Sequence, residues 1–422
     1  MKRYTEYKDS GVPWIGDIPG HWILARNKAF LLERKETVGK RTEYPLLSLT
    51  REGVIYRDVE SGKGKFPKDF DTYKIVSKGD VIFCLFDVDE TPRTVGLSEI
   101  VGMITGAYNV FAIHDIDKRF LYYFYIAIDD KKGMRPLYTG LRKVINVNKF
   151  LSAKIAIPTP AEQEKIVAFL DKQTNLIESC ICLRERELQT LIELKQGKIA
   201  SSVTRGLNPD VPMKDSGIPW IGMIPAHWEN AQLRKYLRLV SEKNHPEETL
   251  LSVTREQGVI IRNTDSKEEN HNFIPDDLSG YKLVKEGQFV INKMKSWQGS
   301  YAVSKYQGIV SPAYYVCDLN FPDKEFFSIA IRSQAYIGFF TQLSKGIRVG
   351  QWDLSTIALK SVPFFEPPIE EQHQIVEYIK QTITSIDYYI TSLEKEIEYL
   401  KEYKQRLISD VVTGKVDVRD EA

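Results

Sequence analysis

Few residues of the sequence have the types and the spacing that chemistry would need. Asp87, Asp89 and Glu90 lie close together and could supply part of the metal site of a nuclease. No Gly-Lys pair is followed by Ser or Thr, so the sequence lacks a phosphate-binding P-loop. It also lacks a Gly-x-Gly-x-x-Gly after a predicted strand and an Asn-Pro-Pro-Tyr tetrapeptide of the amino-methyltransferase type. The sequence therefore favours a protein that is not itself an enzyme.

The histidines and cysteines do not form a metal-binding or nucleophilic cluster. His21 and His227 each stand beside a tryptophan, and His373 lies among glutamates in a predicted helix. For such isolated histidines a structural role is expected before a catalytic one. The cysteines are too widely spread for a disulfide framework or a four-ligand zinc site. They are Cys84, Cys180, Cys182 and Cys317. We expect no metal site.

Length and composition limit the class of protein. A chain of 422 residues with 42% hydrophobic content can form two or three globular units, each with its own core. The first residues contain no apolar run of signal-peptide length, and no stretch of about 18 apolar residues occurs anywhere. We therefore expect a cytoplasmic protein.

One long motif occurs twice. Lys-Asp-Ser-Gly-x-Pro-Trp-Ile-Gly starts at Lys8 and again at Lys214, and each copy is followed by Ile-Pro and then by His-Trp. A match this long at a separation of 206 residues indicates duplication of a whole domain. Because the motif is rich in Gly, Pro and Trp, we predict an irregular lead-in segment that packs on the end of a helix as a structural clasp.

Shorter echoes of the duplication run through each half. Leu-Leu-Ser-(Leu/Val)-Thr-Arg-Glu starts at Leu46 and at Leu250, and Tyr-Lys-(Ile/Leu)-Val starts at Tyr73 and at Tyr281. These segments have the pattern of short strands joined by polar turns, and aromatic-rich helical segments follow them. The sequence predicts an α/β fold of the α+β kind, with two duplicated mixed domains.

Two segments have the pattern of single long helices. The first begins at Thr159-Pro160-Ala161-Glu162, a capping-box start, and the second begins after Pro367-Pro368. In both helices apolar residues recur at alternating steps of four and three, which is the heptad pattern of a coiled coil. The predicted helix-helix seam consists of Leu170, Ile177, Ile181, Leu188, Leu191, Ile379, Ile383, Ile386, Ile390, Leu393, Ile397 and Leu400.

The two seams are expected to pack against each other. Thr174 and Arg184 interrupt the first seam with polar side chains, while the second is wholly apolar. At 1.5 Å per residue, about 44 helical residues span roughly 65 Å. A helix pair of this length would act as a spacer.

Charge is distributed unevenly along the chain, although the net charge is only +1. Lys and Arg outnumber Asp and Glu by 23 to 17 over residues 24–155 and by 17 to 16 over residues 229–366. Acidic residues are in the majority over 161–204 and 369–413. Positive charge therefore belongs to the globular halves, where a phosphate backbone would be met.

Three patterns together point to a family. The duplicated lead-in is the first. The second follows each Pro-rich helix start, where Glu-Gln, at Glu162 and at Glu371, precedes Ile-Val. The third is the segment 308–314, Gly-Ile-Val-Ser-Pro-Ala-Tyr. In this combination the chain resembles, over essentially its full length, the specificity subunit of type I restriction-modification systems.

The resemblance implies a function and a set of partners. In this family two target-recognition domains each read one half of a split site in double-stranded DNA, and two antiparallel helices hold the domains apart. Two methyltransferase subunits and restriction subunits would dock on the chain. S-adenosylmethionine, ATP and Mg would be bound by those partners, and this chain would bind no cofactor.

The resemblance also implies domain boundaries. The recognition domains would be residues 23–156 and 229–366, and the long helices would be residues 157–205 and 367–413. The remaining segments are the lead-ins, residues 1–22 and 206–228, and a tail, residues 414–422.

A DNA reader needs cations for phosphates and polar side chains for base edges, and the duplicated halves supply both. The candidates are Arg51, Arg57, Lys63, Lys65, Lys74, Arg142, Lys143, Arg255, Arg262, Lys282, Lys293, Lys295, Gln298 and Arg348. The two halves differ most at residues 292–299, a segment that contains Lys293 and Lys295. The first half has an acidic segment around Asp87 at the corresponding place. Trp297 is expected to pin its loop, since duplex bases are already stacked.

Two other classes of protein remain open on the sequence alone. One is a methyltransferase fused to its own reader, which binding of S-adenosylmethionine to the isolated chain would support. The other is a coiled-coil scaffold that assembles proteins without touching DNA, which the acidic helices would allow. Binding to random duplex DNA under a salt titration separates the scaffold from the reader.

Overall fold

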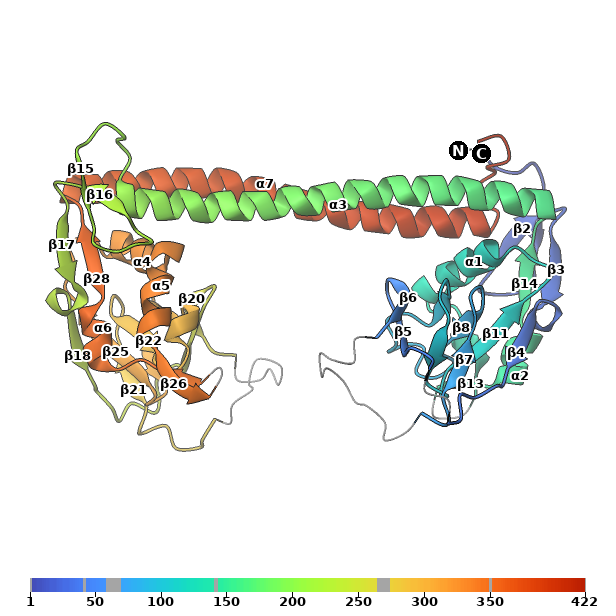
Figure 1. Cartoon of the computed structure of the whole chain (residues 1–422), viewed down its shortest axis with the longest axis horizontal. Helices are drawn as coiled ribbons and strands as arrows, with labels where there is room; N and C mark the ends of the chain where they lie inside the picture. The colour runs from blue at the N-terminus through green and yellow to red at the C-terminus, as the bar shows by residue number, and fades with distance from the viewer. Residues whose placement is uncertain are drawn as a thin grey trace. The chain divides into compact units, whose positions relative to one another are not determined.

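The computed structural model describes residues 2–40, 43–57, 70–139, 143–263, 274–348 and 351–421. The chain divides into two compact units (Figure 1). Unit 1 comprises residues 1–185 and 395–422, and unit 2 comprises residues 186–394. The two long helices, α3 (Pro160–Arg205) and α7 (Ile369–Val412), each begin in one unit and end in the other. The units are thus not consecutive stretches of sequence, because the contacts divide both helices near their middles.

Unit 1 is built on a four-stranded antiparallel sheet with the order β4-β11-β8-β9. These strands are Leu31–Arg34, Asn109–Ile113, Val81–Phe83 and Val95–Leu97. Two-stranded antiparallel pairs surround the sheet: β1 (Tyr7–Asp9) with β2 (Asp17–Pro19), β3 (Ile23–Arg26) with β14 (Lys154–Ile157), β5 (Leu47–Thr50) with β6 (Gly53–Tyr56), β7 (Lys74–Val76) with β10 (Gly102–Ile104), and β12 (Tyr138–Thr139) with β13 (Val144–Ile145).

Two short α-helices complete unit 1. Helix α1 (Lys118–Asp130) starts where the Asp117 carboxylate accepts hydrogen bonds from the backbone N–H groups of Arg119 and Phe120, at 2.8 and 2.9 Å. It buries its aromatic side chains next to strand β9. Helix α2 spans Val147–Ser152, and 3-10 turns occur at Asn27–Ala29 and Arg135–Leu137.

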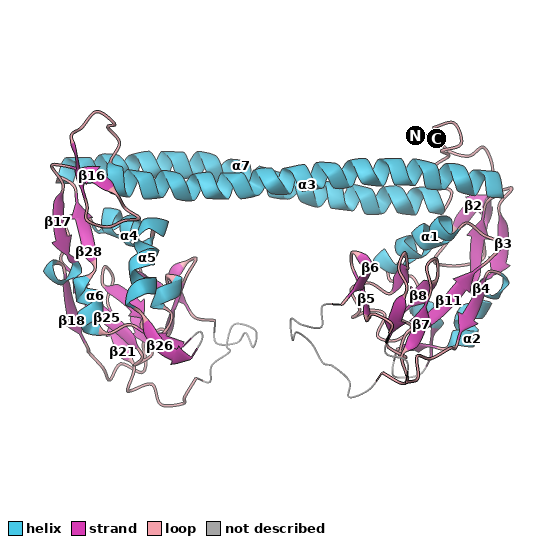
Figure 2. Ribbon diagram, viewed as in Figure 1, coloured by secondary structure: helices cyan, strands magenta, loops and turns pink. Residues whose placement is uncertain are grey.

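Unit 2 repeats this architecture (Figure 2), with a four-stranded sheet of order β18-β25-β22-β23. These strands are Leu237–Val240, Tyr314–Leu319, Phe289–Asn292 and Tyr301–Val303. The surrounding pairs are β15 (Met213–Asp215) with β16 (Met223–Pro225), β17 (Glu229–Gln232) with β28 (Pro363–Glu366), β19 (Leu251–Thr254) with β20 (Gly258–Ile261), β21 (Lys282–Val284) with β24 (Gly308–Val310), and β26 (Lys345–Arg348) with β27 (Gln351–Asp353).

The helical part is where the units differ. The aromatic-rich segment of unit 2 forms two helices, α4 (Lys324–Arg332) and α5 (Gln334–Leu343), which are separated by Ser333 in an extended conformation. Helix α6 spans Thr356–Ser361, and 3-10 turns occur at Leu233–Lys235 and at Ser296–Gln298, the latter labelled η4. The predicted α/β fold with two duplicated mixed domains is confirmed.

Buried aromatic side chains form the core of each unit. In unit 1 the Phe83 ring lies 4.7 Å from that of Phe150 and 6.0 Å from that of Phe111. In unit 2 the Phe289 ring lies 5.3 Å from that of Phe327 and 6.0 Å from that of Tyr301. Strands β8 and β22 are equivalent, but Phe83 stands where unit 2 has Ile291, and Phe289 stands where unit 1 has Val81. The two units thus fill equivalent cores with aromatic side chains from different positions of the strand.

Helices α3 and α7 pack against each other within each unit. In unit 1 Glu178 pairs with Lys404 and Arg184 pairs with Glu396, at 2.5 and 3.0 Å, so the helices run antiparallel. The apolar side chains of the predicted seam are all buried or half-buried. The seam therefore buries apolar surface along its length, and exposed ion pairs such as these add little to stability.

Each lead-in packs on the first turn of a long helix. The Glu162 carboxylate in α3 accepts hydrogen bonds from Tyr4 Oη at 2.7 Å and from Trp22 Nε1 at 3.1 Å, and it lies 2.9 Å from His21 Nε2. These contacts confirm the predicted clasp. They also differ from the expected capping box, because the Glu162 side chain binds the lead-in and does not turn back to Thr159.

The second lead-in is built in the same way. In α7 the Glu371 carboxylate accepts a hydrogen bond from Trp228 Nε1 at 3.0 Å and lies 2.8 Å from His227 Nε2. The Lys214 ammonium, in the repeated motif, donates to the Trp228 carbonyl oxygen at 2.5 Å. The repeated Lys, His, Trp and Glu thus form one structural device that holds the start of a long helix in each unit.

The C-terminal end of each long helix contacts the clasp that holds the start of the other long helix. Gly414, just after α7, has a φ of +74°, and a Cβ there would lie 2.3 Å from Pro19 Cδ. Gly206, just after α3, has a φ of +72° and lies next to Trp228. Glycine suits both positions because it adopts positive φ without steric cost.

Candidate nucleic-acid interface

An arginine and a tyrosine interact electrostatically at equivalent places in the two units. Arg57 follows β6, and its backbone N–H donates to the Leu46 carbonyl at 2.8 Å. Arg262 follows β20, and its N–H donates to Leu250 at 2.9 Å. Burial raises the pKa of Tyr108, and the positive charge of Arg57 opposes that rise. Burial likewise raises the pKa of Tyr314, and the positive charge of Arg262 opposes that rise.

A lysine joins each of these pairs. The Lys74 ammonium on β7 donates to the Tyr108 carbonyl at 2.7 Å, and the Lys282 ammonium on β21 donates to the Tyr314 carbonyl at 2.6 Å. Burial lowers the pKa of both lysines. Since an ammonium has three donors, each lysine ties two strands together and keeps donors for a further acceptor. We call Arg57, Lys74 and Tyr108, with their counterparts in unit 2, the Arg-Lys-Tyr clusters.

The loop after β22 carries the basic residues of unit 2. Lys293 pairs with Asp353 at 3.4 Å, while the Lys295 side chain is exposed. The Trp297 ring packs 4.9 Å from that of Trp352. The backbone carbonyl oxygen of Trp297 accepts a hydrogen bond from Thr341 Oγ1 at 3.1 Å. Trp297 therefore pins the loop, as predicted.

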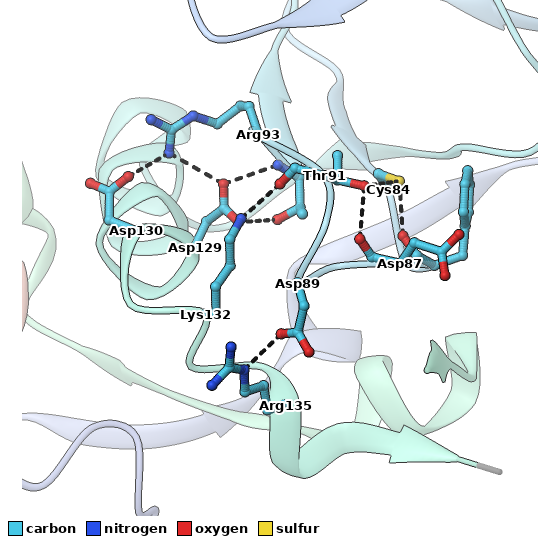
Figure 3. A network of polar contacts seen from close by, with 11 residues as sticks. Cys84, Asp87, Asp89, Thr91, Arg93, Asp129, Asp130, Lys132 and Arg135 are labelled. Atoms are coloured by element: carbon cyan, nitrogen blue, oxygen red, sulfur yellow. Dashed lines mark hydrogen bonds and ion pairs between the residues drawn. The ribbon is translucent and has the colours of Figure 1, made fainter. Parts of the chain in front are cut away.

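The loop after β8 in unit 1 is its acidic counterpart (Figure 3). Asp87 has a φ of +45° and is exposed, and Asp89 pairs with Arg135 at 2.7 Å. Lys143, with a φ of +49°, lies 3.5 Å from the Glu90 carboxylate. The loops that follow the equivalent strands β8 and β22 thus differ in sequence between the units. The Arg-Lys-Tyr cluster beside the loop is present in both units.

Comparison with known proteins now decides the family. Residues 51–181 match the family model described as the type I restriction modification DNA specificity domain. The chain is 25% identical over 319 residues to the type I restriction enzyme MjaVIII specificity subunit of Methanocaldococcus jannaschii, covering 71% of each chain. It is 22% identical to the putative type I restriction enzyme MjaX specificity subunit of the same organism, covering 96% of each. The family model and both relatives indicate a type I restriction-modification specificity subunit.

A solved structure supports the fold of this specificity subunit. A chain from a study of complex assembly and conformational transition of the type I R-M system superimposes with a TM-score of 0.65. The superposition covers 94% of the present chain and 99% of the other, at 14% sequence identity. The fold is therefore shared over nearly the whole length.

The other predicted contact residues are spread more widely. Arg51 and Arg255 are exposed in the turns β5–β6 and β19–β20. A Cβ placed on Gly299 would lie 3.8 Å from Arg255 Cγ, so Arg255 lies beside the basic loop. Gln298 is half-buried in η4. Lys63, Lys65 and Arg142 lie outside the described residues, and the side chain of Arg348, in β26, does so as well.

Several residues of the specificity subunit's candidate interface were missed by sequence reasoning. Tyr108 and Tyr314 had a usable signal, because both follow Ala in the duplicated pattern. Asp353 and Trp352 had none, because contacts between residues so far apart in sequence depend on the fold.

Among the described ranges no three His, Cys, Asp or Glu side chains are grouped so that they could hold a metal ion. In the same part of the chain no helix is long and apolar enough to span a membrane.

Proposed function

We propose that this specificity subunit binds double-stranded DNA through both recognition domains, each of which contacts one half of a bipartite site. One observation carries the proposal: the two units share an Arg-Lys-Tyr cluster at the same place and differ in the loop beside it. Shared cations suit a task common to both halves, which is neutralising phosphates. Loops that differ suit the task that must differ, which is reading base edges.

The basic loop of unit 2 offers hydrogen-bond donors to DNA. Lys295 is exposed, and in the described part of the chain no ion pair involves its side chain. Lysine donors match the O6 and N7 acceptors of guanine in the major groove. Gln298, in the same loop, can both donate and accept. We propose that at least one of Lys293, Lys295 and Gln298 contacts a base.

Alanine substitution of these three residues tests the proposal. A residue that contacts a phosphate should weaken binding to all duplexes and lower the salt slope by about one when replaced. A residue that contacts a base should relax the preference at one position of the second half-site, by about 1 to 3 kcal/mol. The measurement is the affinity of Lys293→Ala, Lys295→Ala and Gln298→Ala for duplexes varied in each half-site, at several salt concentrations.

Lys305→Ala supplies the matched control, because Lys305 is an exposed lysine of the same unit at the other end of β23. It should bind as the wild type does. Wild-type behaviour in all three loop variants would move the reading surface elsewhere in unit 2. Absence of any duplex binding by the wild-type assembly would favour a scaffold without DNA readout.

The helix pair is proposed to dock partner subunits. In unit 1 Leu176 and Leu183 of α3 are 55% and 62% exposed, and Tyr399 and Tyr403 of α7 are also exposed. Large apolar side chains gathered on an exposed helix face are typical of protein-binding surfaces. We assign this face to a methyltransferase subunit. Restriction subunits would complete the assembly. S-adenosylmethionine, ATP and Mg would be bound by these partners.

Replacing the α3 leucines tests the docking face. Leu176→Ser with Leu183→Ser should lower the amount of methyltransferase subunit that co-purifies with the chain, because the apolar area offered to the partner is lost. Lys172→Ser with Asn175→Ser changes exposed polar residues of the same helix and should leave co-purification unchanged. Equal recovery of the methyltransferase subunit with both double variants would refute this assignment.

A further inference from the structure

The acidic loop of unit 1, residues 85–93, and the basic loop of unit 2, residues 293–299, are equivalent in position. Each starts and ends on a backbone hydrogen bond between its flanking strands. Cys84 N–H donates to the Thr94 carbonyl at 2.8 Å, and Asn292 N–H donates to the Ser300 carbonyl at 3.0 Å. The two loops therefore leave the repeated sheet at the same place, although their lengths and sequences differ.

A single buried carboxylate holds the end of the unit 1 loop (Figure 3). Asp129 is 1% exposed and accepts hydrogen bonds from the Thr94 N–H at 3.0 Å and from Thr94 Oγ1 at 2.6 Å. Its carboxylate also lies 3.3 Å from Arg93 Nη1 and 2.9 Å from Lys132 Nζ. The Lys132 ammonium donates to the Thr91 carbonyl at 2.8 Å. Three residues at one end of the loop are thus tied, directly or through one lysine, to Asp129.

The network joins the loop to a rigid element. Asp129 lies in the last turn of α1, whose aromatic side chains are buried in the core. Arg93 also pairs with Asp130 at 2.9 Å. Burial raises the pKa of Asp130, and the charge of Arg93 opposes that rise. Because a buried carboxylate is stable only when its donors are in place, the network favours one arrangement of helix and loop.

The tip of the same loop remains accessible. Asp87 and Glu90 are exposed, while Arg93 is only 16% exposed. A loop with a fixed end and an exposed tip loses little conformational freedom on binding, which favours discrimination between ligands.

The basic loop of unit 2 is held by other means. Its contacts include the packing of Trp297 on Trp352, the hydrogen bond from Thr341, and a hydroxyl contact of 3.2 Å between Ser296 and Ser344. The Lys293–Asp353 pair is a further contact. The partner groups come from α5, β27 and the segment after α5. A change at Asp129 therefore acts on the loop of unit 1 through contacts that have no part in holding the loop of unit 2.

We propose that Asp129 is a positioning residue for base reading by the first recognition domain. It fixes the 85–93 loop on α1 in the conformation that discriminates between bases of the first half-site. The inference rests on the proposed function, and it adds the residue that sets the specificity of one half alone.

Selection from a randomised duplex library tests the inference, using the full-length chain with the subunits that co-purify with it. Wild-type protein should enrich a two-part motif. Asp129→Asn removes the carboxylate charge that pairs with Lys132 and leaves Arg93 with Asp130 alone. Base discrimination in one half of the motif should therefore fall about tenfold, and the other half should be unchanged. Lys132→Met removes the ammonium that binds the Thr91 carbonyl and the Asp129 carboxylate, and it should loosen the same half to a smaller extent.

Asp80→Asn is the matched control. Asp80 is also a buried carboxylate of unit 1 and pairs with Arg34 at 2.7 Å, but it precedes β8, whereas the loop follows that strand. It should lower the melting temperature and leave both halves of the motif intact. An unchanged motif with Asp129→Asn and Lys132→Met, equal loosening of both halves, or equal loosening by Asp80→Asn would overturn the inference. Failure of the wild-type protein to enrich a two-part motif would instead refute the proposed function.

Discussion

Removing one heptad from each long helix is expected to shorten the gap between the two half-sites and to leave both half-sites unchanged. The matched segments are residues 184–190 of α3 and 392–398 of α7, which face each other in the antiparallel register of the Glu178–Lys404 and Lys195–Asp387 pairs. Seven residues correspond to about 10 Å of helix, or roughly three base pairs of DNA. Sequencing of methylated positions in cells that carry the variant would give the length of the gap.

We expect this result because the helices set the distance between the half-sites and the domains read their sequences. Each deleted segment contains two seam positions, so the remaining seam keeps its register. Deleting the segment from α3 alone is the control, and it should prevent assembly because the two seams no longer match. An altered half-site, or an unchanged gap in the matched variant, would show that the helices do not set the spacing.

Ile386→Asp is expected to destabilise unit 2 by about 3 to 5 kcal/mol, since it removes a buried aliphatic side chain and places a carboxylate in an apolar seam. Ile386 is 8% exposed on α7. Denaturant unfolding of the purified chain would measure the loss.

Thr384→Asp introduces the same charge on the exposed face of the same helix and should change stability by less than about 0.5 kcal/mol. Equal unfolding midpoints for Ile386→Asp and the wild-type chain would mean that α7 does not depend on this seam.

Much of the architecture could be predicted because duplication and periodicity are properties of sequence. The repeated motif at Lys8 and Lys214 predicts two equivalent units, and the structure repeats the order of the four-stranded sheet in both. Apolar residues recur along α7 at alternating spacings of four and three residues. This pattern predicts the buried seam, because a helix brings such positions to one face. The clasp could be placed on a helix end, since Gly, Pro and Trp do not continue a regular element.

Other features depend on contacts that the sequence does not record. Glu162 completes a recognisable capping box that starts at Thr159, yet the buried Trp22 N–H needs an acceptor, and the Glu162 carboxylate supplies it. Lys74 has the residue type of a phosphate contact, while its hydrogen bond to Tyr108 depends on how strands far apart in sequence pair. The role of Asp129 depends on its contact with Thr94, which lies 35 residues earlier in the chain, and no pattern in the sequence marks that contact.

The most direct test of the account is to map the methylated positions in the genome of a host that expresses this chain with its methyltransferase subunit. We expect methylation in a bipartite motif, with two defined half-sites separated by a gap of fixed length and variable sequence. We also expect that replacing residues 229–366 with those of another specificity subunit changes one half-site and keeps the other. A continuous motif, or a swap that changes both half-sites, would contradict it.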